Sequence, residues 1–319
     1  MSSPQTTTAA EPTPERFSNP LLRLVAATRP AFLSVTLVGC LIGLATAYAD
    51  GVTLHPITAA ATILIALVAH AGGNVINDYH DAVSGADAAN VGRIFPFTGG
   101  SRFIQNGVMT PGQTARFGYG LLALAIPGGL WLAALSGWGL IVIGTAGLLL
   151  GWAYSAPPLH LVARGLGEVA VTACWLLVVL GADYVQRGGF GWTPVAAGLS
   201  FALLVANLLY INQFPDHDSD AAAGKRTVVV RLGPESARWG YLGIAVAAYA
   251  WLIVQIGRDN LPQVCAAAAI TLLLSFNAAR QLREHASEPA ELETAIKLTI
   301  GAAVLHGLIM AAMLAFNWR

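Results

Sequence analysis

Charged residues are scarce in this chain of 319 residues. Lysine and arginine number 17, aspartate and glutamate number 17, and together they make up only 11% of the sequence, against 55% hydrophobic residues. The mean hydropathy is +0.62. Soluble domains carry about 25% charged residues, so this composition excludes an ordinary soluble protein. We expect an all-α, polytopic membrane protein that lies in the lipid bilayer and does not bind nucleic acid.

Cysteine is rare as well, and the three cysteines each lie in a different apolar run, at Cys40, Cys174 and Cys265. This spacing excludes a disulfide framework and a cysteine metal site. Residues 1–19 are rich in Ser, Thr and Pro and lack the apolar core of a signal peptide. We therefore expect residues 1–20 to form a disordered cytoplasmic tail. The remainder, 21–319, is expected to be a single transmembrane domain.

Long apolar runs, by contrast, are abundant. Nine of them fall in the range of about 17 to 25 residues that spans a bilayer as a helix. They cover approximately residues 31–48, 57–79, 115–135, 138–156, 166–186, 193–214, 236–256, 261–280 and 294–316. In the fourth run, small residues at close spacing indicate tight packing against other helices; these are Gly139, Gly144, Gly147 and Gly151.

The positions of the basic residues predict the topology. Lys and Arg accumulate in the cytoplasmic segments of membrane proteins. If the N-terminus is cytoplasmic, only Arg187, Arg258 and Arg319 of the 17 basic residues lie outside. We therefore expect a multi-pass protein of the inner (plasma) membrane with a cytoplasmic N-terminus and an external C-terminus.

Aspartates gather where the second predicted span ends. Asn74, Asp78 and Asp81 stand at i, i+4 and i+7, which places them on one helix face. Asn77 lies beside them, and Asp87 follows shortly afterwards. Ionisable residues at the edge of a membrane span are functional by default.

A second cluster closes the sixth predicted span. Asp216 and Asp220 are again four residues apart, with Asn212 one turn earlier, whereas Asp218 lies off this stripe. Under the predicted topology both clusters face the cytoplasm. Carboxylates packed closely repel one another unless a cation is present, and hard oxygen ligands suit Mg²⁺. We expect Mg²⁺ as the cofactor, with Asp78, Asp81, Asp87, Asp216 and Asp220 as its ligands.

Basic residues follow both clusters on the same side of the membrane. Arginine and lysine near metal-bound oxygens hold a diphosphate and stabilise it as a leaving group. With apolar helices behind such a head group, the substrate class indicated is an isoprenoid diphosphate. We expect Asp78, Asp81, Asp216 and Asp220 to be catalytic, and the substrate to be bound by Asn74, Asn77, Arg102, Tyr154, Arg164, Asn212, Lys225 and Arg226.

Several alternatives stay open at this point. The positive-inside bias alone would place Lys225 and Arg226 in the cytoplasm. Tyr154 could be an interfacial residue or a cavity wall, and His70 could pack between helices or line the cavity. From a different class of protein, a divalent-cation transporter also carries carboxylates in a helix bundle. Both clusters lie at one rim rather than through the membrane depth, which favours an enzyme.

The two clusters resemble conserved motifs of a known family. Asn77, Asp78 and Asp81 match NDxxDxxxD, and Asp216 and Asp220 match DxxxD, of the UbiA superfamily of intramembrane aromatic prenyltransferases. The strict first motif has its last Asp where this chain has Gly85; the carboxylate comes at Asp87 instead. That spacing is similar to the 1,4-dihydroxy-2-naphthoate polyprenyltransferase (menaquinone) branch. So are the segments 164–168 and 224–233, the start at 28–30 and the loop 154–159.

This resemblance covers residues 21–317 and implies both a fold and an activity. The fold would be nine transmembrane helices around a central cavity that opens to lipid, with a cytoplasmic cap of loops. The activity would be Mg²⁺-dependent transfer of a polyprenyl group from its diphosphate to an aromatic acceptor. The branch implies 1,4-dihydroxy-2-naphthoate as that acceptor, with 4-hydroxybenzoate or homogentisate as alternatives.

Overall fold

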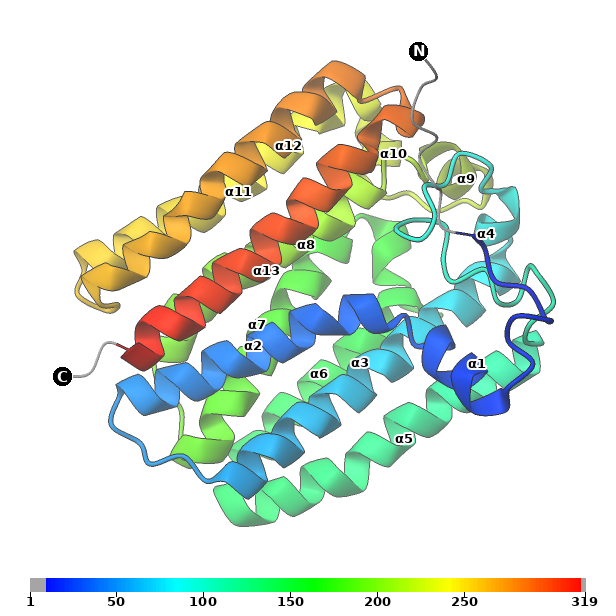
Figure 1. Cartoon of the computed structure of the whole chain (residues 1–319). Coiled ribbons are helices and arrows are strands. Elements are labelled where there is room, and N and C mark those ends of the chain that lie inside the picture. Colours follow the sequence, from blue (N-terminus) through cyan, green and yellow to red (C-terminus); the bar gives the residue numbers. More distant parts are fainter. Residues whose placement is uncertain (1–9, 317–319) are drawn as a thin grey trace.

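The computed structural model describes residues 10–316, and its regular elements there are all helical (Figure 1). In chain order the elements are α1 Pro20–Ala27, α2 Pro30–Ala49, α3 Pro56–Ser84, α4 Ala86–Ala89, α5 Pro111–Ser136, α6 Gly139–Ser155, η1 Leu161–Arg164, α7 Gly167–Arg187, α8 Thr193–Asn212, α9 His217–Ala222, α10 Val228–Leu232, α11 Pro234–Gly257, η2 Gln263–Thr271, α12 Leu272–His285, η3 Pro289–Leu292 and α13 Glu293–Phe316. The long helices lie side by side, and the short elements α1, α4, α9 and α10 gather at one end.

The predicted class, an all-α membrane protein, is confirmed. Among the described residues, 8 helices are long and apolar enough to cross a membrane. The shorter apolar helix α6 has 17 residues and lies at the position of the fourth predicted span. That length is at the lower limit of about 17 residues for a spanning helix, so a count of nine requires α6 to cross as well. Helix α13 ends opposite the end at which α1 lies (Figure 1), as an odd number of crossings requires.

Proline sets the start of many of these helices. It occupies one of the first two positions of α1, α2, α3, α5, α8 and α11. The first turn of a helix has no partner for its N–H groups, so the missing proton of proline costs nothing there. Within α5, Pro127 is an interior exception, which neighbouring helices in a bundle tolerate.

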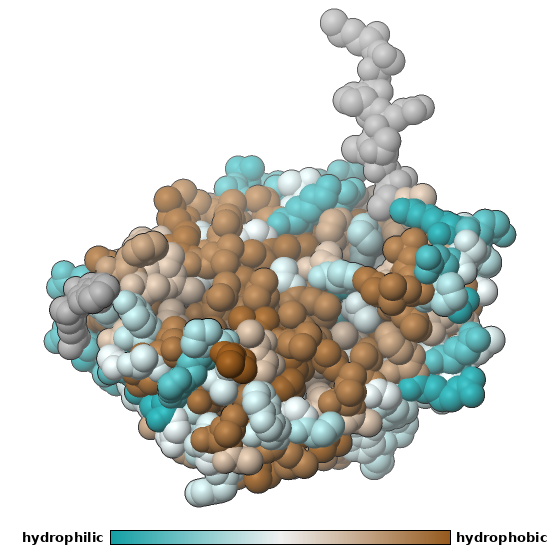
Figure 2. Space-filling view, turned by 60° about the horizontal axis from the view of Figure 1, so that its bottom comes forward, coloured by the Kyte–Doolittle hydropathy of each residue, from teal (hydrophilic) through white to brown (hydrophobic). Residues whose placement is uncertain are grey.

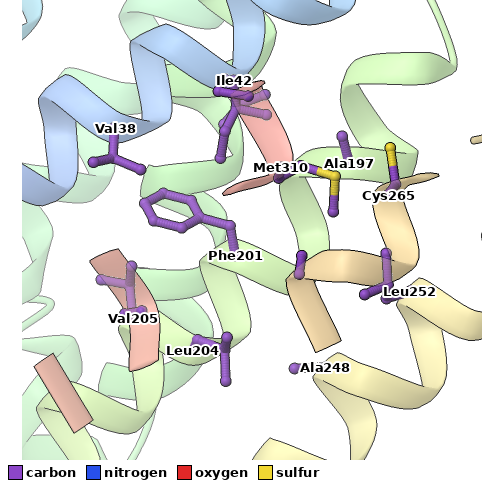
Figure 3. Close-up of a cluster of buried hydrophobic side chains, with 14 of the residues drawn as sticks. Val38, Ile42, Ala197, Phe201, Leu204, Val205, Ala248, Leu252, Cys265 and Met310 are labelled. Atoms are coloured by element: carbon purple, nitrogen blue, oxygen red, sulfur yellow. The ribbon is translucent and has the colours of Figure 1, made fainter. Parts of the chain in front are cut away.

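The main core lies around α8. Phe201 on this helix points toward Val38 and Ile42 of α2, with Met310 of α13 beside them (Figure 3). A Cβ added at Gly307 would lie only 2.2 Å from Val38 Cγ1, so glycine is what permits α13 to approach α2 this closely. The central position of α8 determines where the second Asp cluster, which follows its C-terminal end, is placed.

Apolar side chains dominate the middle of the molecular surface, and polar ones gather toward its margins (Figure 2). Large exposed hydrophobic residues include Leu130, Ile253 and Phe276. An apolar band of this kind is suited to contact with lipid rather than water.

Residues 10–19 lie against the segment that follows α4. Glu11 forms an ion pair with Arg93 at 2.5 Å and accepts a hydrogen bond from the Asn106 amide at 3.0 Å. Phe17 packs on Phe103 with ring centroids 5.0 Å apart. The remainder of the predicted disordered tail, residues 1–9, lies outside the described residues.

Candidate active site

Helix α3 carries the first Asp cluster on its last two turns. At 29 residues and a rise of 1.5 Å per residue it is about 43 Å long, more than the roughly 30 Å of a hydrocarbon core. Its final turns therefore extend toward the interface before the helix ends at Gly85, whose φ of 82° favours glycine. Asn77 and Asp81 line a cavity at this point, together with Asp87 from α4.

Asp78 does not line that cavity. It is only 4% exposed, and its carboxylate accepts a hydrogen bond from the Ser101 backbone N–H at 3.2 Å. A Cβ at Gly100 would lie 2.7 Å from Asp87 Oδ2 and 3.1 Å from Asp78 Oδ1. Glycine is therefore what permits this loop to sit on the two carboxylates. The loop thus engages the oxygens of Asp78. Its predicted roles as metal ligand and catalytic residue stay predictions.

Asp87 is buried with other negative groups nearby. Burial, together with the charges of Asp81 and Asp78, raises the pKa of Asp87 to about 8. Its carboxylate also accepts a hydrogen bond from the Gln105 amide at 3.3 Å. Acids crowded in this way repel one another unless a cation lies between them.

The second cluster follows the C-terminal end of α8. That helix ends at Asn212, the chain turns, and α9 begins at His217 with Asp216 at its N-cap. Asp216 accepts a hydrogen bond from the Asn90 side chain at 2.6 Å. Burial raises the pKa of Asp216, although the bond from Asn90 opposes this. Asp218 is exposed and pairs with its neighbour His217, so it lies outside the cavity.

Lys225 joins the two clusters. Its Nζ lies 2.6 Å from Asp81 Oδ1 and 3.5 Å from Asp220 Oδ1, and its side chain is almost fully buried. Burial alone would lower the pKa of Lys225, but the carboxylates of Asp81 and Asp220 raise it above its ordinary value. Burial also raises the pKa of Asp220 to about 7, against the opposing charge of Lys225. A charged ammonium therefore lies between the α3 and α9 carboxylates.

The other predicted basic residues lie elsewhere. Arg102 is buried and donates a hydrogen bond to the carbonyl oxygen of Asp87. Arg164 and Arg226 are exposed, and the Arg231 guanidinium donates to the carbonyl oxygens of both, at 3.0 and 2.7 Å. Arg231 thus ties η1 to the segment before α10. The predicted substrate contacts of Arg102, Arg164 and Arg226 stay predictions.

The cavity has a volume of about 500 Å³ and two different ends. Its polar end brings together carboxylates, amides and one lysine from α3, α4, α8, α9 and the loops; these residues are Asn74, Asn77, Asp81, Asp87, Asn90, Asn212, Asp216, Asp220 and Lys225. The rest is walled largely by apolar side chains of α2, α3, α5, α6, α7 and α8. Tyr154, at the C-terminal end of α6, lies on the cavity wall, which is one of the two positions considered for it from the sequence.

The donor atoms at the polar end fit a hard cation. The side-chain oxygens of Asn90 and Asn212 are buried without a hydrogen-bond partner, and four carboxylates line the same space. Oxygen donors of this kind are the ligands that Mg²⁺ prefers. Within residues 10–316, no three carboxylate, His or Cys side chains are already gathered closely enough to hold a metal ion.

Helix α6 presents glycine to the cavity. Gly144, Gly147 and Gly151 line it, and a Cβ added at any of them would meet nothing within 4 Å. The expected tight helix packing is wrong for these three residues, because this face of α6 looks onto the cavity instead of onto another helix. It holds for Gly139, where a Cβ would lie 2.6 Å from the Tyr184 hydroxyl oxygen.

Sequence reasoning missed several polar residues of the cavity, among them Arg29 and Asn90. Arg29 precedes α2 with a φ of 56°, its guanidinium lies over the Phe32 ring at 4.4 Å, and it lines the cavity. Asn90 contacts Asp216 across 126 residues of chain. The sequence held a signal for Arg29, which is a basic residue directly before a span. It held none for Asn90, because this residue lies in an irregular loop.

Comparison with known proteins shows which family this chain is similar to. The profile of the UbiA prenyltransferase family matches residues 36–301. A 1,4-dihydroxy-2-naphthoate octaprenyltransferase of Mycobacterium tuberculosis is 29% identical over 260 residues, which are 81% of this chain and 84% of that protein. A 2-carboxy-1,4-naphthoquinone phytyltransferase of Synechocystis is 23% identical over 298 residues, 92% of each chain.

Solved structures share the fold. A UbiA homologue from Archaeoglobus fulgidus bound to DMAPP and Mg²⁺ superposes with a TM-score of 0.63 at 17% identity, over 91% of this chain and 99% of that one. The same homologue bound to GPP and Mg²⁺ gives a TM-score of 0.61 at 16% identity, over 91% and 99%. With the family profile matched over most of its length, this chain belongs to the UbiA prenyltransferase family.

Proposed function

We propose that this protein transfers a polyprenyl group from its diphosphate to an aromatic ring, with 1,4-dihydroxy-2-naphthoate as the acceptor. The observation that carries the proposal is the cavity itself. Carboxylates of both clusters meet around Lys225 at its polar end, and the remainder is largely apolar. A diphosphate head and a hydrocarbon tail require these two environments next to each other.

The polar end would hold the diphosphate together with Mg²⁺. The residues that fit the metal are Asp81, Asp87, Asp216 and Asp220, with the unpaired oxygens of Asn90 and Asn212 beside them. When bound there, Mg²⁺ supplies positive charge to the diphosphate oxygens. Lys225 adds a fixed positive charge, which stabilises the negative charge that develops on the leaving diphosphate.

The apolar part of the cavity would protect the reacting prenyl group from water. As the carbon–oxygen bond to diphosphate breaks, positive charge appears on the allylic carbon, and the aromatic ring supplies the electron pair of the new carbon–carbon bond. The attacked ring carbon then loses its proton, or its carboxylate as carbon dioxide, and the ring becomes aromatic again. Tyr154 presents a ring on the cavity wall, and aromatic faces stabilise nearby cations. Exclusion of water prevents hydrolysis of the reactive allylic group.

The acceptor is proposed from the relatives and is tested by a panel of ring compounds. Several of the related proteins act on naphthoates or naphthoquinones by name. Purified protein given labelled polyprenyl diphosphate and Mg²⁺ should prenylate 1,4-dihydroxy-2-naphthoate in preference to 4-hydroxybenzoate and homogentisate. Turnover of 4-hydroxybenzoate with none of the naphthoate would reject this acceptor. Because the chain belongs to a prenyltransferase family, an enzyme is favoured over the alternative of a divalent-cation transporter.

The glycine face of α6 leads to a prediction about chain length. Gly147→Leu should leave turnover of a short prenyl diphosphate within about threefold of the wild type and reduce that of a long one at least tenfold. The reason is that a leucine side chain at this position takes up space that is now open in the cavity. Turnover measured against prenyl diphosphates of increasing length checks this.

Gly120→Leu is the matched control for this substitution. Gly120 lies on α5, is exposed, and also has open space at its Cβ position, but it does not line the cavity. It should leave the preference for chain length unchanged. A Gly147→Leu protein with an unaltered preference would show that the tail does not lie along α6.

The orientation in the membrane is likewise proposed from the basic residues. A reporter enzyme that works only outside the cytoplasm should be active when it is fused after residue 319. A reporter enzyme that works only in the cytoplasm should be active when it is fused in the loop 223–227, beside Lys225. In this orientation the site would lie at the cytoplasmic face of the inner membrane. A cytoplasmic C-terminal reporter would overturn the topology.

A further inference from the structure

The wall of the cavity carries a polar patch that diphosphate binding leaves unused. Thr36 on α2, His70 on α3 and Trp175 on α7 all line the cavity. Thr36 Oγ1 lies 2.8 Å from His70 Nδ1. The His70 and Trp175 rings meet edge to face, with centroids 5.1 Å apart and planes at 90°. Three helices thus bring hydrogen-bonding groups to one spot.

The hydrogen bonding of this patch is incomplete. Trp175 Nε1 is buried and has no hydrogen-bond partner, although buried indole N–H groups usually find one. His70 Nδ1 lies 2.8 Å from Thr36 Oγ1, and the Asn74 side chain also bonds the imidazole, so the Trp175 N–H is the donor of this patch that is left without a partner. The hydrocarbon tail of a prenyl group has no atom that could accept or donate a hydrogen bond here. An aromatic acid with hydroxyl or carboxylate groups has both.

A second buried histidine shows what a purely structural histidine looks like in this bundle. His306 on α13 is 0% exposed and does not line the cavity. Its Nε2 lies 3.0 Å from Ser200 Oγ, and its Nδ1 lies 3.3 Å from the Ala268 carbonyl oxygen. Both ring nitrogens are thus engaged by the protein. His70 differs in that it borders the cavity, beside the unpartnered Trp175 N–H.

The patch is also in the right place for the second substrate. His70, Asn74, Asn77 and Asp81 follow one another on the same face of α3, at intervals of three or four residues. From His70 to Asp81 the helix rises about 16 Å. A ring held at the patch would therefore lie on the apolar side of the diphosphate site, next to the start of the prenyl chain.

We propose that His70 and Trp175 form the binding subsite for the aromatic acceptor, with Thr36 as a positioning residue that fixes the imidazole. The inference rests on the proposed prenyl transfer and names the site of its second substrate. The Trp175 N–H and the His70 imidazole bond the polar substituents of the ring, and the two side-chain rings pack against it. The ligand recognised is an aromatic compound bearing hydroxyl or carboxylate groups.

Steady-state kinetics of two substitutions test the subsite. Trp175→Phe keeps a ring and removes the N–H, and His70→Phe removes both ring nitrogens. Each should raise the KM for the acceptor by about five- to tenfold, the effect of losing one hydrogen bond to a ligand. The KM for the prenyl diphosphate should change less than twofold. His70→Gln, whose amide can replace one hydrogen bond, should recover part of the affinity for the acceptor.

Trp239→Phe is the matched control, since Trp239 is exposed and lies under Arg283 away from the cavity. It should change neither KM. If Trp175→Phe and His70→Phe, both folded as judged by thermal unfolding, left the KM for the acceptor unaltered, the subsite would be refuted. An equal rise of both KM values would refute it as well, because a merely structural role predicts that result.

Direct binding separates this inference from the proposed function. Calorimetric titration of 1,4-dihydroxy-2-naphthoate into the detergent-solubilised wild type and Trp175→Phe proteins needs no turnover. If the wild type formed no prenylated product with any acceptor, the proposed function would fail. Weaker binding to Trp175→Phe would still support the subsite in that case, and equal binding would reject it.

Discussion

Replacing Asp220 by Asn should lower turnover by about a hundredfold or more, the scale of losing one electrostatic contact to a transition state. Asp220 is buried at the polar end of the cavity, and its Oδ1 lies 3.5 Å from Lys225 Nζ. Asparagine has nearly the same size and removes one negative charge, so the change acts on charge more than on packing. Asp81→Asn should have an effect of the same size, because Asp81 lies 2.6 Å from the same ammonium. Initial rates with labelled prenyl diphosphate measure both.

Asp218→Asn is the matched control for these substitutions. Asp218 lies only two residues from Asp220, but its side chain is fully exposed and pairs with His217. It should cost less than about threefold in rate, as surface substitutions usually have small effects. Near-normal turnover of folded Asp81→Asn and Asp220→Asn proteins would contradict the role given to both clusters.

Replacing Lys225 by Gln should weaken the binding of prenyl diphosphate by at least about a hundredfold. The cavity would then present four carboxylates to a negatively charged substrate without the ammonium that now joins Asp81 to Asp220. Truncating one partner of a buried charge pair costs about 2 to 5 kcal/mol at binding sites. Equilibrium binding of labelled prenyl diphosphate in the presence of Mg²⁺ measures the loss.

Lys225→Arg separates charge from geometry at this position. Arginine keeps the positive charge, so its protein should bind more tightly than Lys225→Gln, and it should unfold closer to the temperature of the wild type. Leaving a buried carboxylate unpaired is destabilising by about 3 to 5 kcal/mol, so the Gln variant should unfold at a lower temperature. Equal binding by Lys225→Gln and the wild type would show that the ammonium does not contact the diphosphate.

Much of the fold was predictable because it depends on local properties of the chain. The length of an apolar run determines whether it can cross a bilayer, and proline marks where many helices begin. The spacing of Asn74 and Asp81 on α3 indicated a shared face, and both line the cavity. The exposure of Asp218 also agreed with its place off the Asp216 and Asp220 stripe.

Other features depend on which segment packs against each helix face. The spacing of residues in the sequence does not give this information. Asp78 lies on the predicted stripe, yet the loop at Gly100 and Ser101 covers it. The chain turns between Asn212 and His217, so the second cluster does not continue the face of α8. Such arrangements are set by segments distant in sequence.

Glycine and arginine were the least informative residues. A glycine in an apolar helix can permit close packing, as Gly139 does, or leave open space, as Gly147 does. Both have the same pattern in the sequence. Arg102 followed the first cluster as expected, but it donates to a backbone carbonyl oxygen instead of lining the cavity, because a long side chain can reach in many directions.

A double-mutant cycle tests most directly the claim that both clusters hold one diphosphate. The measurement is the dissociation constant of an unreactive prenyl thiolodiphosphate, with Mg²⁺, for the wild type, Asp81→Asn, Asp220→Asn and the double variant. Because both carboxylates share Lys225, the account predicts that the effects are coupled, with the double variant departing from the sum of the singles by more than about 0.5 kcal/mol. The account would be contradicted if the effects of the two substitutions on the free energy of binding were additive. It would also be contradicted if either single substitution left the dissociation constant unchanged.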